Sequence, residues 1–549
     1  MHLDLIAPFA FLALAASARA QAPTVTVRDG RLLGAATTQS IGFGIDVALA
    51  GDTAVVGSPY NSSSTPGEAR VFVRGVSGWS LQATLTPSNP ADTWFGSSVA
   101  IEGERIVVGA RGALGSGPGV VGALYVFERS GTQWTESARI TGTGTTVDEV
   151  LGFSVALQGD TIACGAPRDP HYGAGAAYVF VHGLNGWTQQ ARFEPNDGEG
   201  FDYFGFDLAL DGNRIAVGAH SDNHPTAANG GSVYIFERSG STWSQVNKIV
   251  PADNRSNDLF GSALDLEGDT LVVGAPADDH GAVMDSGSLY VFTHGLLGWT
   301  QAQKVASISG QDSDAFGASV DLEGARLLVG EYYGANYAAS SAGAAYLLER
   351  SGATFGVTFE LTATSAEQWA GFGSGVALDG ERALVAAYED DSLATGNNTG
   401  AVYAYRLEPM VASYCTAKVN SQGCAPAITW SGLPLLATAT PFEIVATNVL
   451  NQQNGLLFYG YASASVPFQG GTLCVALPLL RTALRNSGGS LGAPNCSGSY
   501  ALDFKAHMAS GVDPELFAGA EVFAQWWCRD PSAASTTGLT DALHFHVRP

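Results

Sequence analysis

Short apolar runs alternate with glycine-centred turns along most of the chain. In one well-preserved stretch, a tight turn at residues 267–269 leads into Leu271-Val272-Val273, and a longer loop then leads to Ser288–Phe292. Runs of β-branched and aromatic residues bounded by Gly, Pro and Asp are typical of antiparallel strands rather than helices. The pattern predicts an all-β chain.

A unit of four such runs recurs with a nearly constant period. Each copy opens on an aromatic–glycine pair (Leu-Gly in the third copy), and successive pairs stand 52 to 56 residues apart. A Trp marks the fourth run in five copies, and Phe355 replaces it in the sixth. Self-similarity at a fixed period is the sequence signature of a repeat architecture. The opening pairs are Phe43-Gly44, Phe95-Gly96, Leu151-Gly152, Phe204-Gly205, Phe260-Gly261, Phe316-Gly317 and Phe372-Gly373.

A four-stranded unit of this size cannot bury both of its apolar faces by itself. Radial packing of such sheets covers both faces, so the seven copies predict a seven-bladed β-propeller. The seventh copy lacks a fourth run after Tyr405. Residues 31–35 precede Phe43 by the spacing at which residues 83–87 precede Phe95. We therefore expect an N-terminal strand to complete the last blade and close the ring.

These repeats resemble those of the FG-GAP repeat family, whose best-known members form the β-propeller head of integrin α chains. The resemblance rests on the Phe-Gly pairs and on a Gly-Ala-Pro element after the second run, as at residues 165–167 and 274–276. It covers roughly residues 24 to 408 and weakens in the last two copies, which have Gly330-Glu331-Tyr332 and Ala386-Ala387-Tyr388. The resemblance implies a role in adhesion or ligand binding.

The metal sites of integrin blades are not transferred to this chain. Many of those blades carry a D-x-D-x-D-G calcium loop between the first and second strands. The same position here holds tight turns such as Asp211-Gly212-Asn213, which offer too few oxygen atoms for the roughly 6–8 ligands of Ca²⁺. The sequence therefore predicts no cofactor and leaves Ca²⁺ open as a cation for acidic loops.

Long, variable loops should gather on one face of the propeller. The connections from second to third strand and the crossings between blades fall on that face, and the opposite face has only tight turns. Binding residues concentrate in loops on a rigid scaffold, so we predict that the loop face binds a ligand. Almost every crossing carries an Asp, which favours capping of turn amides over a ligand site. These residues are Asp92, Asp148, Asp202, Asp258 and Asp314.

Asp and His side chains that stand close together in the loops are candidate metal-binding or acid–base residues. Such pairs can share a metal or transfer protons, although solvated loop residues would show the same pattern. No G-x-S-x-G, H-E-x-x-H or P-loop motif accompanies them, so we predict no catalytic residue. The candidates are Asp169 with His171, Asp222 with His224, and Asp278 and Asp279 with His280.

The last quarter of the chain has a different organisation. Runs such as residues 442–446 and 472–476, separated by Gly, Ser and Pro, predict a compact β-sandwich over residues 409–549. The strings at residues 467–475 and 525–531 resemble those of a C-terminal module on secreted repeat proteins of environmental bacteria. We therefore expect a second domain after the propeller.

Five of the six cysteines lie in that last part. Exported proteins form disulfides in an oxidising environment, and the CxxC spacing of zinc sites is absent. Cys164 stands alone within a predicted strand and should be a buried, inert thiol. The predicted pairs are Cys415–Cys424 and Cys474–Cys496, with Cys528 left unpaired, and the alternative pairs Cys528 with Cys474.

Two histidines near the C-terminus are a further candidate. His544 and His546 stand two positions apart on a predicted strand, so their side chains should point the same way and could bind a metal. The sequence shows no third ligand beside them.

An export signal is expected at the N-terminus. Leu5–Ala16 is apolar, and Ala18-Arg19-Ala20 matches an A-x-A cleavage site before Gln21. No later run reaches the roughly 18 apolar residues needed to span a bilayer. We predict a signal peptide over residues 1–20, the propeller over 21–408 and the C-terminal domain over 409–549.

The charge balance limits the partners. The chain has 51 acidic and 26 basic residues, for a net charge of −25, which argues against nucleic acid because phosphate binding needs clustered Lys and Arg. These observations favour a secreted or cell-surface monomer that binds an extracellular protein or glycan, rather than an enzyme. The alternative is an extracellular metal-dependent hydrolase with its site on the loop face or in the central channel.

Overall fold

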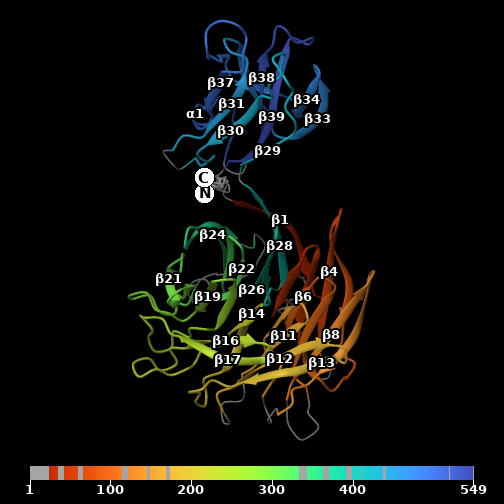
Figure 1. The fold of residues 1–549 in the computed structure, drawn as a ribbon, viewed down its shortest axis with the longest axis vertical. Coiled ribbons are helices and arrows are strands. Elements are labelled where there is room, and N and C mark those ends of the chain that lie inside the picture. Colours follow the sequence, from red (N-terminus) through yellow and green to blue (C-terminus); the bar gives the residue numbers. More distant parts are fainter. Residues whose placement is uncertain are drawn as a thin grey trace, which may run out of the picture. The chain divides into compact units, whose positions relative to one another are not determined.

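Two units, each with its own core, make up the computed structural model (Figure 1). The first is Thr26–Glu408, and the second contains Pro409–Pro549. The predicted signal peptide lies outside the described residues. The structure describes residues 24–34, 42–59, 66–113, 121–144, 149–167, 173–332, 343–361, 363, 370–390, 399–409, 411–436, 440–517 and 520–547.

Seven four-stranded sheets form the first unit, counted over the described residues. In six of them, successive strands pair antiparallel in chain order. Blade 1 is β2 (Val47–Ala50), β3 (Thr53–Ser58), β4 (Glu68–Gly75) and β5 (Gly78–Leu85). Blade 2 is β6 (Thr93–Glu102), β7 (Arg105–Gly112), β8 (Ala123–Ser130) and β9 (Gln133–Ile140), and blade 3 is β10 (Val155–Gln158), β11 (Thr161–Ala166), β12 (Ala176–Gly183) and β13 (Gly186–Phe193).

The next three sheets repeat this order. Blade 4 is β14 (Phe204–Asp211), β15 (Arg214–Ala219), β16 (Ser232–Ser239) and β17 (Thr242–Ile249). Blade 5 is β18 (Ala263–Glu267), β19 (Thr270–Ala275), β20 (Ser288–Gly295) and β21 (Gly298–Ala306). Blade 6 is β22 (Phe316–Glu323), β23 (Arg326–Glu331), β24 (Ala344–Ser351) and β25 (Thr354–Leu361).

The seventh sheet combines the two ends of the repeat region. Its order is β1-β28-β27-β26, so β1 (Thr24–Leu33) takes the fourth place beside β28 (Ala401–Pro409), β27 (Arg382–Ala387) and β26 (Phe372–Asp379). An ion pair of 3.2 Å between Arg31 and Asp390 adds to this pairing. The N-terminal strand therefore completes the last blade, as its spacing predicted.

Apolar side chains fill the space between neighbouring sheets all the way round. Each of seven core clusters in the described residues combines two successive blades. One of them packs Val47 and Leu49 of blade 1 against Leu384 and Val402 of blade 7. The sheets thus form a closed ring, and the all-β propeller predicted from the repeats is confirmed.

Glycine in the repeat motifs allows the backbones of neighbouring blades to touch. A Cβ on Gly274 of the Gly-Ala-Pro element would lie 1.9 Å from the carbonyl oxygen of Gly317, which belongs to the Phe-Gly pair of the next blade. Gly317 itself has a φ of 89°, which disfavours any other residue. Gly109 and Gly152 show the same contact at 2.1 Å. The contact between blades therefore explains the glycine of each motif, which only blade 7 replaces, with Ala386.

Side chains also join the tight turns of adjacent blades. The Asp211 carboxylate accepts a hydrogen bond from the Gly268 amide of the next blade at 2.7 Å. Blade 7 makes the same link to blade 1, where Asp379 accepts from the Gly51 amide and Arg382 donates to the Gly51 carbonyl at 3.1 Å. The acidic residues of these turns therefore hold the ring together.

Two sheets enclose the core of the second unit. The larger has the order β29-β39-β38-β32, with β35 and β36 both beside β32, and the smaller has the order β30-β31-β37. Ile444 and Tyr500 of the smaller sheet pack with Trp526 and Phe545 of the larger. The strands are β29 (Val411–Tyr414), β30 (Ala427–Ser431), β31 (Glu443–Val449), β32 (Asn454–Gly460), β35 (Leu480–Arg481), β36 (Arg485–Asn486), β37 (Gly498–Asp503), β38 (Glu521–Arg529) and β39 (Thr537–His546).

The second unit also contains a separate hairpin and a helix, of which the sequence predicted only the strand at residues 472–476. A hairpin of β33 (Ser463–Phe468) and β34 (Gly471–Val475) forms a sheet of its own. Helix α1 (Phe504–Ala509) follows β37, and its N-cap Asp503 accepts a hydrogen bond from the Ala506 amide at 3.1 Å. At six residues, the helix is too short to give a periodic signal in the sequence.

The disulfides differ from the predicted pairs. Cys415 pairs with Cys474 and Cys424 pairs with Cys496, each with Cα atoms 6.4 Å apart. The predicted pairs Cys415–Cys424 and Cys474–Cys496 are therefore wrong, as is the alternative with Cys528, which is buried and free. Cys164 is also buried and free, as predicted.

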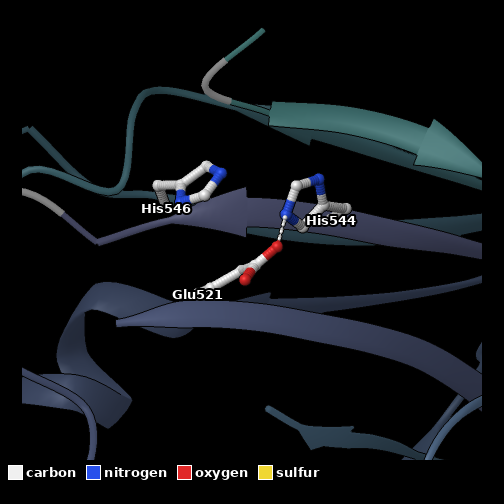
Figure 2. A group of neighbouring side chains, drawn as sticks. All are labelled: Glu521, His544 and His546. Carbon is white, nitrogen blue, oxygen red and sulfur yellow. Dashed lines mark hydrogen bonds and ion pairs between the residues drawn. The ribbon is translucent and has the colours of Figure 1, made fainter. Parts of the chain in front are cut away.

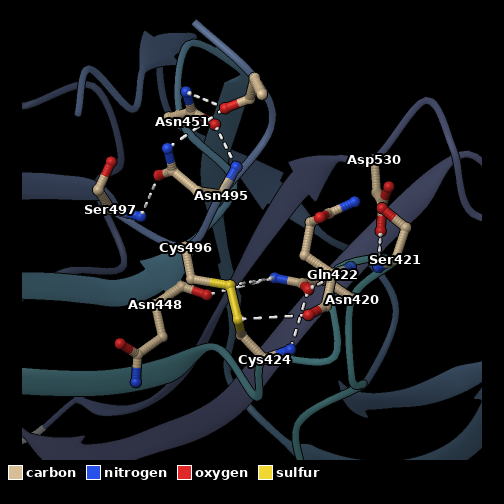
Figure 3. Close-up of a disulfide and its surroundings, with 11 residues drawn as sticks. Asn420, Ser421, Gln422, Cys424, Asn448, Asn451, Asn495, Cys496, Ser497 and Asp530 are labelled. Atoms are coloured by element: carbon tan, nitrogen blue, oxygen red, sulfur yellow. Dashed lines mark hydrogen bonds between the residues drawn. A yellow bond between two sulfur atoms is a disulfide. The ribbon is translucent and has the colours of Figure 1, made fainter. Parts of the chain in front are cut away.

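Packing of distant segments explains the correction. The β33–β34 hairpin lies against the larger sheet, where Gln525 of β38 accepts a hydrogen bond from the Cys474 amide at 3.1 Å and Tyr414 donates to the Cys474 carbonyl at 2.5 Å. Asn420 accepts from the Cys424 amide at 3.1 Å and turns this segment toward Cys496 (Figure 3). Both disulfides join segments far apart in the sequence, which cysteine spacing alone does not reveal.

Replacing Gly274 tests the contact between blades. We expect Gly274→Ala to lower the free energy of unfolding by about 3 kcal/mol, because the added methyl group would overlap the backbone of the next blade. Gly295→Ala in the same blade is the control, since a Cβ there meets no atom within 4 Å. Urea unfolding followed by Trp fluorescence measures both variants, and equal stability of the two would contradict the role of the contact.

Candidate functional site

The loop face consists of the connections between second and third strands and the crossings between blades. Two of the connections are described in full, residues 220–231 of blade 4 and residues 276–287 of blade 5. The candidates Asp169 and His171, and Asp148 of a crossing, lie outside the described residues.

The candidate aspartates Asp222 and Asp278 are bound by side chains of their own blades. Asp222 accepts a hydrogen bond from the Tyr234 hydroxyl at 3.0 Å and pairs with Lys248 at 2.7 Å. Asp278 pairs with Lys304 at 2.6 Å. Both aspartates are at most 4 % exposed. These buried ion pairs fasten the loops to the sheets and leave neither carboxylate open as a metal ligand.

The candidate histidines hold the same two loops. His224 Nε2 lies 3.0 Å from the Gly231 carbonyl oxygen, and His280 Nδ1 lies 2.9 Å from the Ser286 hydroxyl. Asp278 and His280 are brought to 3.9 Å of each other. Because the ring nitrogens contact the loop itself, the geometry favours a structural role for these histidines over acid–base chemistry.

An acid–tyrosine–cation network recurs in other blades. In blade 2, the Asp92 carboxylate accepts from the Tyr125 hydroxyl and from Arg139 Nε, both at 2.6 Å. The Tyr is the third residue of the third strand, and the cation stands opposite it on the fourth. Burial raises the pKa of the Tyr hydroxyl, which therefore remains a donor. The corresponding residues are Glu149, Tyr178 and Arg192 in blade 3, and Asp390, Tyr403 and Arg31 in blade 7.

The recurring aspartates of the crossings cap turns. Asp202, Asp258 and Asp314 each accept a hydrogen bond from the amide three residues earlier in the chain, at 2.6, 2.6 and 2.7 Å. All three are at most 2 % exposed. This is the role that their regular recurrence favoured.

Blade 6 departs from the network. Glu360 stands opposite Tyr346, at the position where blades 2 to 5 have Lys or Arg. The acid of this blade is Glu331, which is 2 % exposed. Burial, and then the charge of Asp314, raises the pKa of Glu331 to about 8. Over the described residues, blade 6 therefore gathers carboxylates around its Tyr without the usual cation.

The loops of blades 4 and 5 have the same backbone but differ in charge. The Asn229 amide donates to the Asn223 side chain at 3.0 Å, and 56 residues later the Asp285 amide donates to the Asp279 side chain at 2.9 Å. In blade 5, Asp312 of the crossing also accepts from a loop amide, at 2.9 Å. Burial, and then the charges of Asp279 and Asp312, raises the pKa of Asp285.

These carboxylates form an acidic patch across blades 5 and 6. The crossing between the two blades joins the blade 5 part of the patch to the blade 6 part. The charge of Asp312 raises the pKa of Asp285, and the charge of Asp314 raises the pKa of Glu331. The apolar side chains of Met284 and Ile308 are 62 % and 42 % exposed in the same connections. The acidic patch consists of Asp279, Asp285, Asp312 and Glu360 at the surface and of the buried Asp314 and Glu331.

A second set of carboxylates faces the axis of the ring. The Asp46 side chain accepts from the Val99 amide of the next blade at 2.7 Å, and Asp207 accepts from the Leu264 amide at 2.8 Å. Asp46 belongs to blade 1 and Asp207 to blade 4, yet the charge of Asp46 raises the pKa of Asp207. Because side chains of blades that are not neighbours can approach each other only in the centre of the ring, both point toward the axis. Burial raises the pKa of Asp46 to about 6 and that of Asp207 to about 7.

One group of potential metal ligands comes together within the described residues, and it lies in the second unit. Glu521, His544 and His546 place their ligand atoms within 4.8 Å of one another. The sequence singled out the two histidines but missed Glu521, because its position beside them depends on strand register. The loop-face candidates do not form such a group in the described part of the chain.

Comparison with known proteins supports the repeat assignment. The family model described as FG-GAP repeat matches residues 79–127, 134–180, 187–236, 243–292, 299–348 and 356–405. No curated protein matches the chain. None of the described helices is long and apolar enough to cross a membrane.

The carboxylates at the axis predict a pH-dependent stability. Asp46 and Asp207 have folded-state pKa values of about 6 and about 7, above the roughly 3.9 of an unfolded chain. Folding therefore favours the protonated forms, and the stability present below about pH 4 is lost as pH rises through 6 to 7. We expect urea midpoints to fall from about pH 5 to about pH 8.

Asp207→Asn should reduce this pH dependence, whatever its effect on stability at one pH. Asp269→Asn is the control, because its side chain is 72 % exposed at a tight turn. An unchanged slope of stability against pH in Asp207→Asn would contradict the assignment.

Supplying the missing cation of blade 6 should stabilise it. We expect Glu360→Lys to raise the free energy of unfolding by about 1 kcal/mol at pH 8, since Lys stands there in blades 4 and 5. The gain should increase from about pH 6 to about pH 9, as Glu331 ionises. Glu515→Lys, at an exposed site of the second unit, controls for net charge. Urea unfolding provides the measurement, and equal effects of the two variants would contradict the prediction.

Proposed function

Because the chain belongs to the FG-GAP repeat family, we propose that it is an extracellular binding protein whose loop face takes up a protein or glycan ligand. The FG-GAP repeats and the two disulfides fit an extracellular protein. The observation that carries the proposal is the closed ring of sheets, with long loops fastened to it on one face only.

Rigid loops favour binding because little conformational entropy is lost when the ligand is taken up. The buried ion pairs of Asp222 and Asp278 hold the bases of two loops, and His224 and His280 contact the loops themselves. A scaffold of this kind presents a preformed surface.

The acidic patch indicates the chemistry of the ligand. Asp285 and Asp312 are exposed, and exposed Met284 and Ile308 stand in the same connections. In blade 6, the connections at residues 332–343 and 362–371 contain no Lys or Arg that could neutralise the exposed carboxylates of the patch. Lys or Arg side chains of a protein ligand would supply the missing positive charge. The patch therefore favours a basic protein segment over a neutral glycan.

Screening for ligands tests the proposal directly. Purified chain 21–549 is applied to arrays of extracellular proteins, basic peptides and glycans, and positives are measured by surface plasmon resonance at two salt concentrations. We expect micromolar or tighter binding to basic proteins that weakens as salt increases, because exposed charges are screened. Absence of any ligand at micromolar concentrations would contradict the proposed function.

Blade 4 provides a template for the matched variant. The triple substitution Asp279→Asn, Asp285→Asn and Asp312→Ser gives blade 5 the residues that blade 4 has 56 positions earlier. Affinity should fall at least about tenfold, or about 1.4 kcal/mol. The control changes Glu104, Asp160 and Asp269 of the opposite face to amides. An equal loss in the control would assign binding to overall charge rather than to the loop face.

A further inference from the structure

Two adjacent strands of the second unit bring three metal-binding side chains to the same face of the larger sheet. Glu521 of β38 stands directly opposite His546 of β39, and Phe523 stands opposite His544. His544 and His546 are two positions apart, so they share a face. Figure 2 shows the three side chains gathered on the sheet. The register therefore supplies the third ligand that the sequence does not show.

Packing fixes the directions of these side chains. Val522 and Phe545 are fully buried in the core on one face, so their neighbours Glu521, His544 and His546 must point away from that core. The Phe523 ring stacks on His544 with centroids 4.6 Å apart. The site is therefore held by two strands and an aromatic contact rather than by a loop.

The distances suit a shared ion after small side-chain rotations. His544 Nε2 lies 2.9 Å from Glu521 Oε1, and one ligand atom from each residue lies within 4.8 Å of the others. Atoms bound tetrahedrally to one zinc ion stand about 3.3 Å apart, given Zn–N and Zn–O bonds of about 2.0–2.2 Å. Rotation of the imidazole rings can close the difference without moving the strands.

Burial gives the site a closed side and an open side. His546 is 8 % exposed, and the side chains of His544 and Glu521 are 17 % and 50 % exposed. An ion could enter past Glu521, and the buried His546 would exclude water from the opposite side. Three protein ligands with one side open to solvent leave the fourth position of a tetrahedral ion for water or an external ligand.

We propose that Glu521, His544 and His546 form a zinc site. Two imidazoles and one carboxylate are ligands for Zn²⁺ and related transition metals, whereas Ca²⁺ and Mg²⁺ take oxygen ligands. A metal ion bound to His544 Nε2 takes the place of any proton on that nitrogen and of its contact with Glu521. A protonated imidazole therefore releases its proton to solvent when the metal binds. The site is independent of the loop face and of the proposed ligand binding.

Zinc titration of the full mature chain tests the site. Protein freed of metal with a chelator is titrated with Zn²⁺ by calorimetry in excess Ca²⁺, which occupies oxygen-only sites on the acidic surface. We expect one tight Zn²⁺ per chain, and affinity that decreases as pH falls through about 6.5, where imidazole protonates. Co²⁺ in place of Zn²⁺ should give the visible absorption of a tetrahedral ion.

Variants then assign the ligands. Glu521→Gln and His544→Ala, both at partly exposed positions, should each weaken Zn²⁺ binding at least about tenfold, since even indirect partners of a metal contribute that much. Circular dichroism establishes that each variant is folded, and His546→Ala is added if it folds. Glu443→Gln on β31 and His182→Ala in the propeller are the controls. Absence of tight binding, or binding unaltered in the ligand variants, would overturn the proposal.

Discussion

Each blade has two apolar faces, and only the neighbouring blades can cover them. The blades pack closely, because the second strand of one blade contacts the backbone of the next at glycine. Between Gly274 and Gly317 there is no room for a Cβ atom. That contact sets the spacing of the sheets and so the dimensions of the ring. The links between tight turns, the carboxylates at the axis and the positions of the loops all depend on it.

The repeat could be predicted because this contact recurs between blades and requires glycine on both sides, with Ala386 of blade 7 as the exception. The Phe-Gly and Gly-Ala-Pro elements are visible in the sequence as consequences of the packing, and the spacing of residues 31–35 was enough to place the closing strand. The roles of the acidic loop residues were harder to predict. Asp222 is neutralised by Lys248, 26 positions later and two strands away, and the sequence does not display that partnership.

The second unit was predicted less well because it has no repeat. Its disulfides join Cys415 to the hairpin at Cys474 and Cys424 to the segment before β37, so the pairing follows from packing rather than from distance along the chain. Glu521 was missed for the same reason. It approaches His544 only through the register of β38 against β39, which the residue pattern leaves undetermined.

The shared last blade has a consequence for synthesis. Arg31 meets Asp390, 359 positions later, so β1 leaves the ribosome long before β28 and finds its partner only when β28 has followed. Until then β1 and the last completed sheet both present unpaired edges, which other chains could pair with. Chains that end early keep these unpaired strand edges, whereas full-length chains pair them when the ring closes. Fragments should therefore aggregate more readily than full-length molecules, in which the ring is complete.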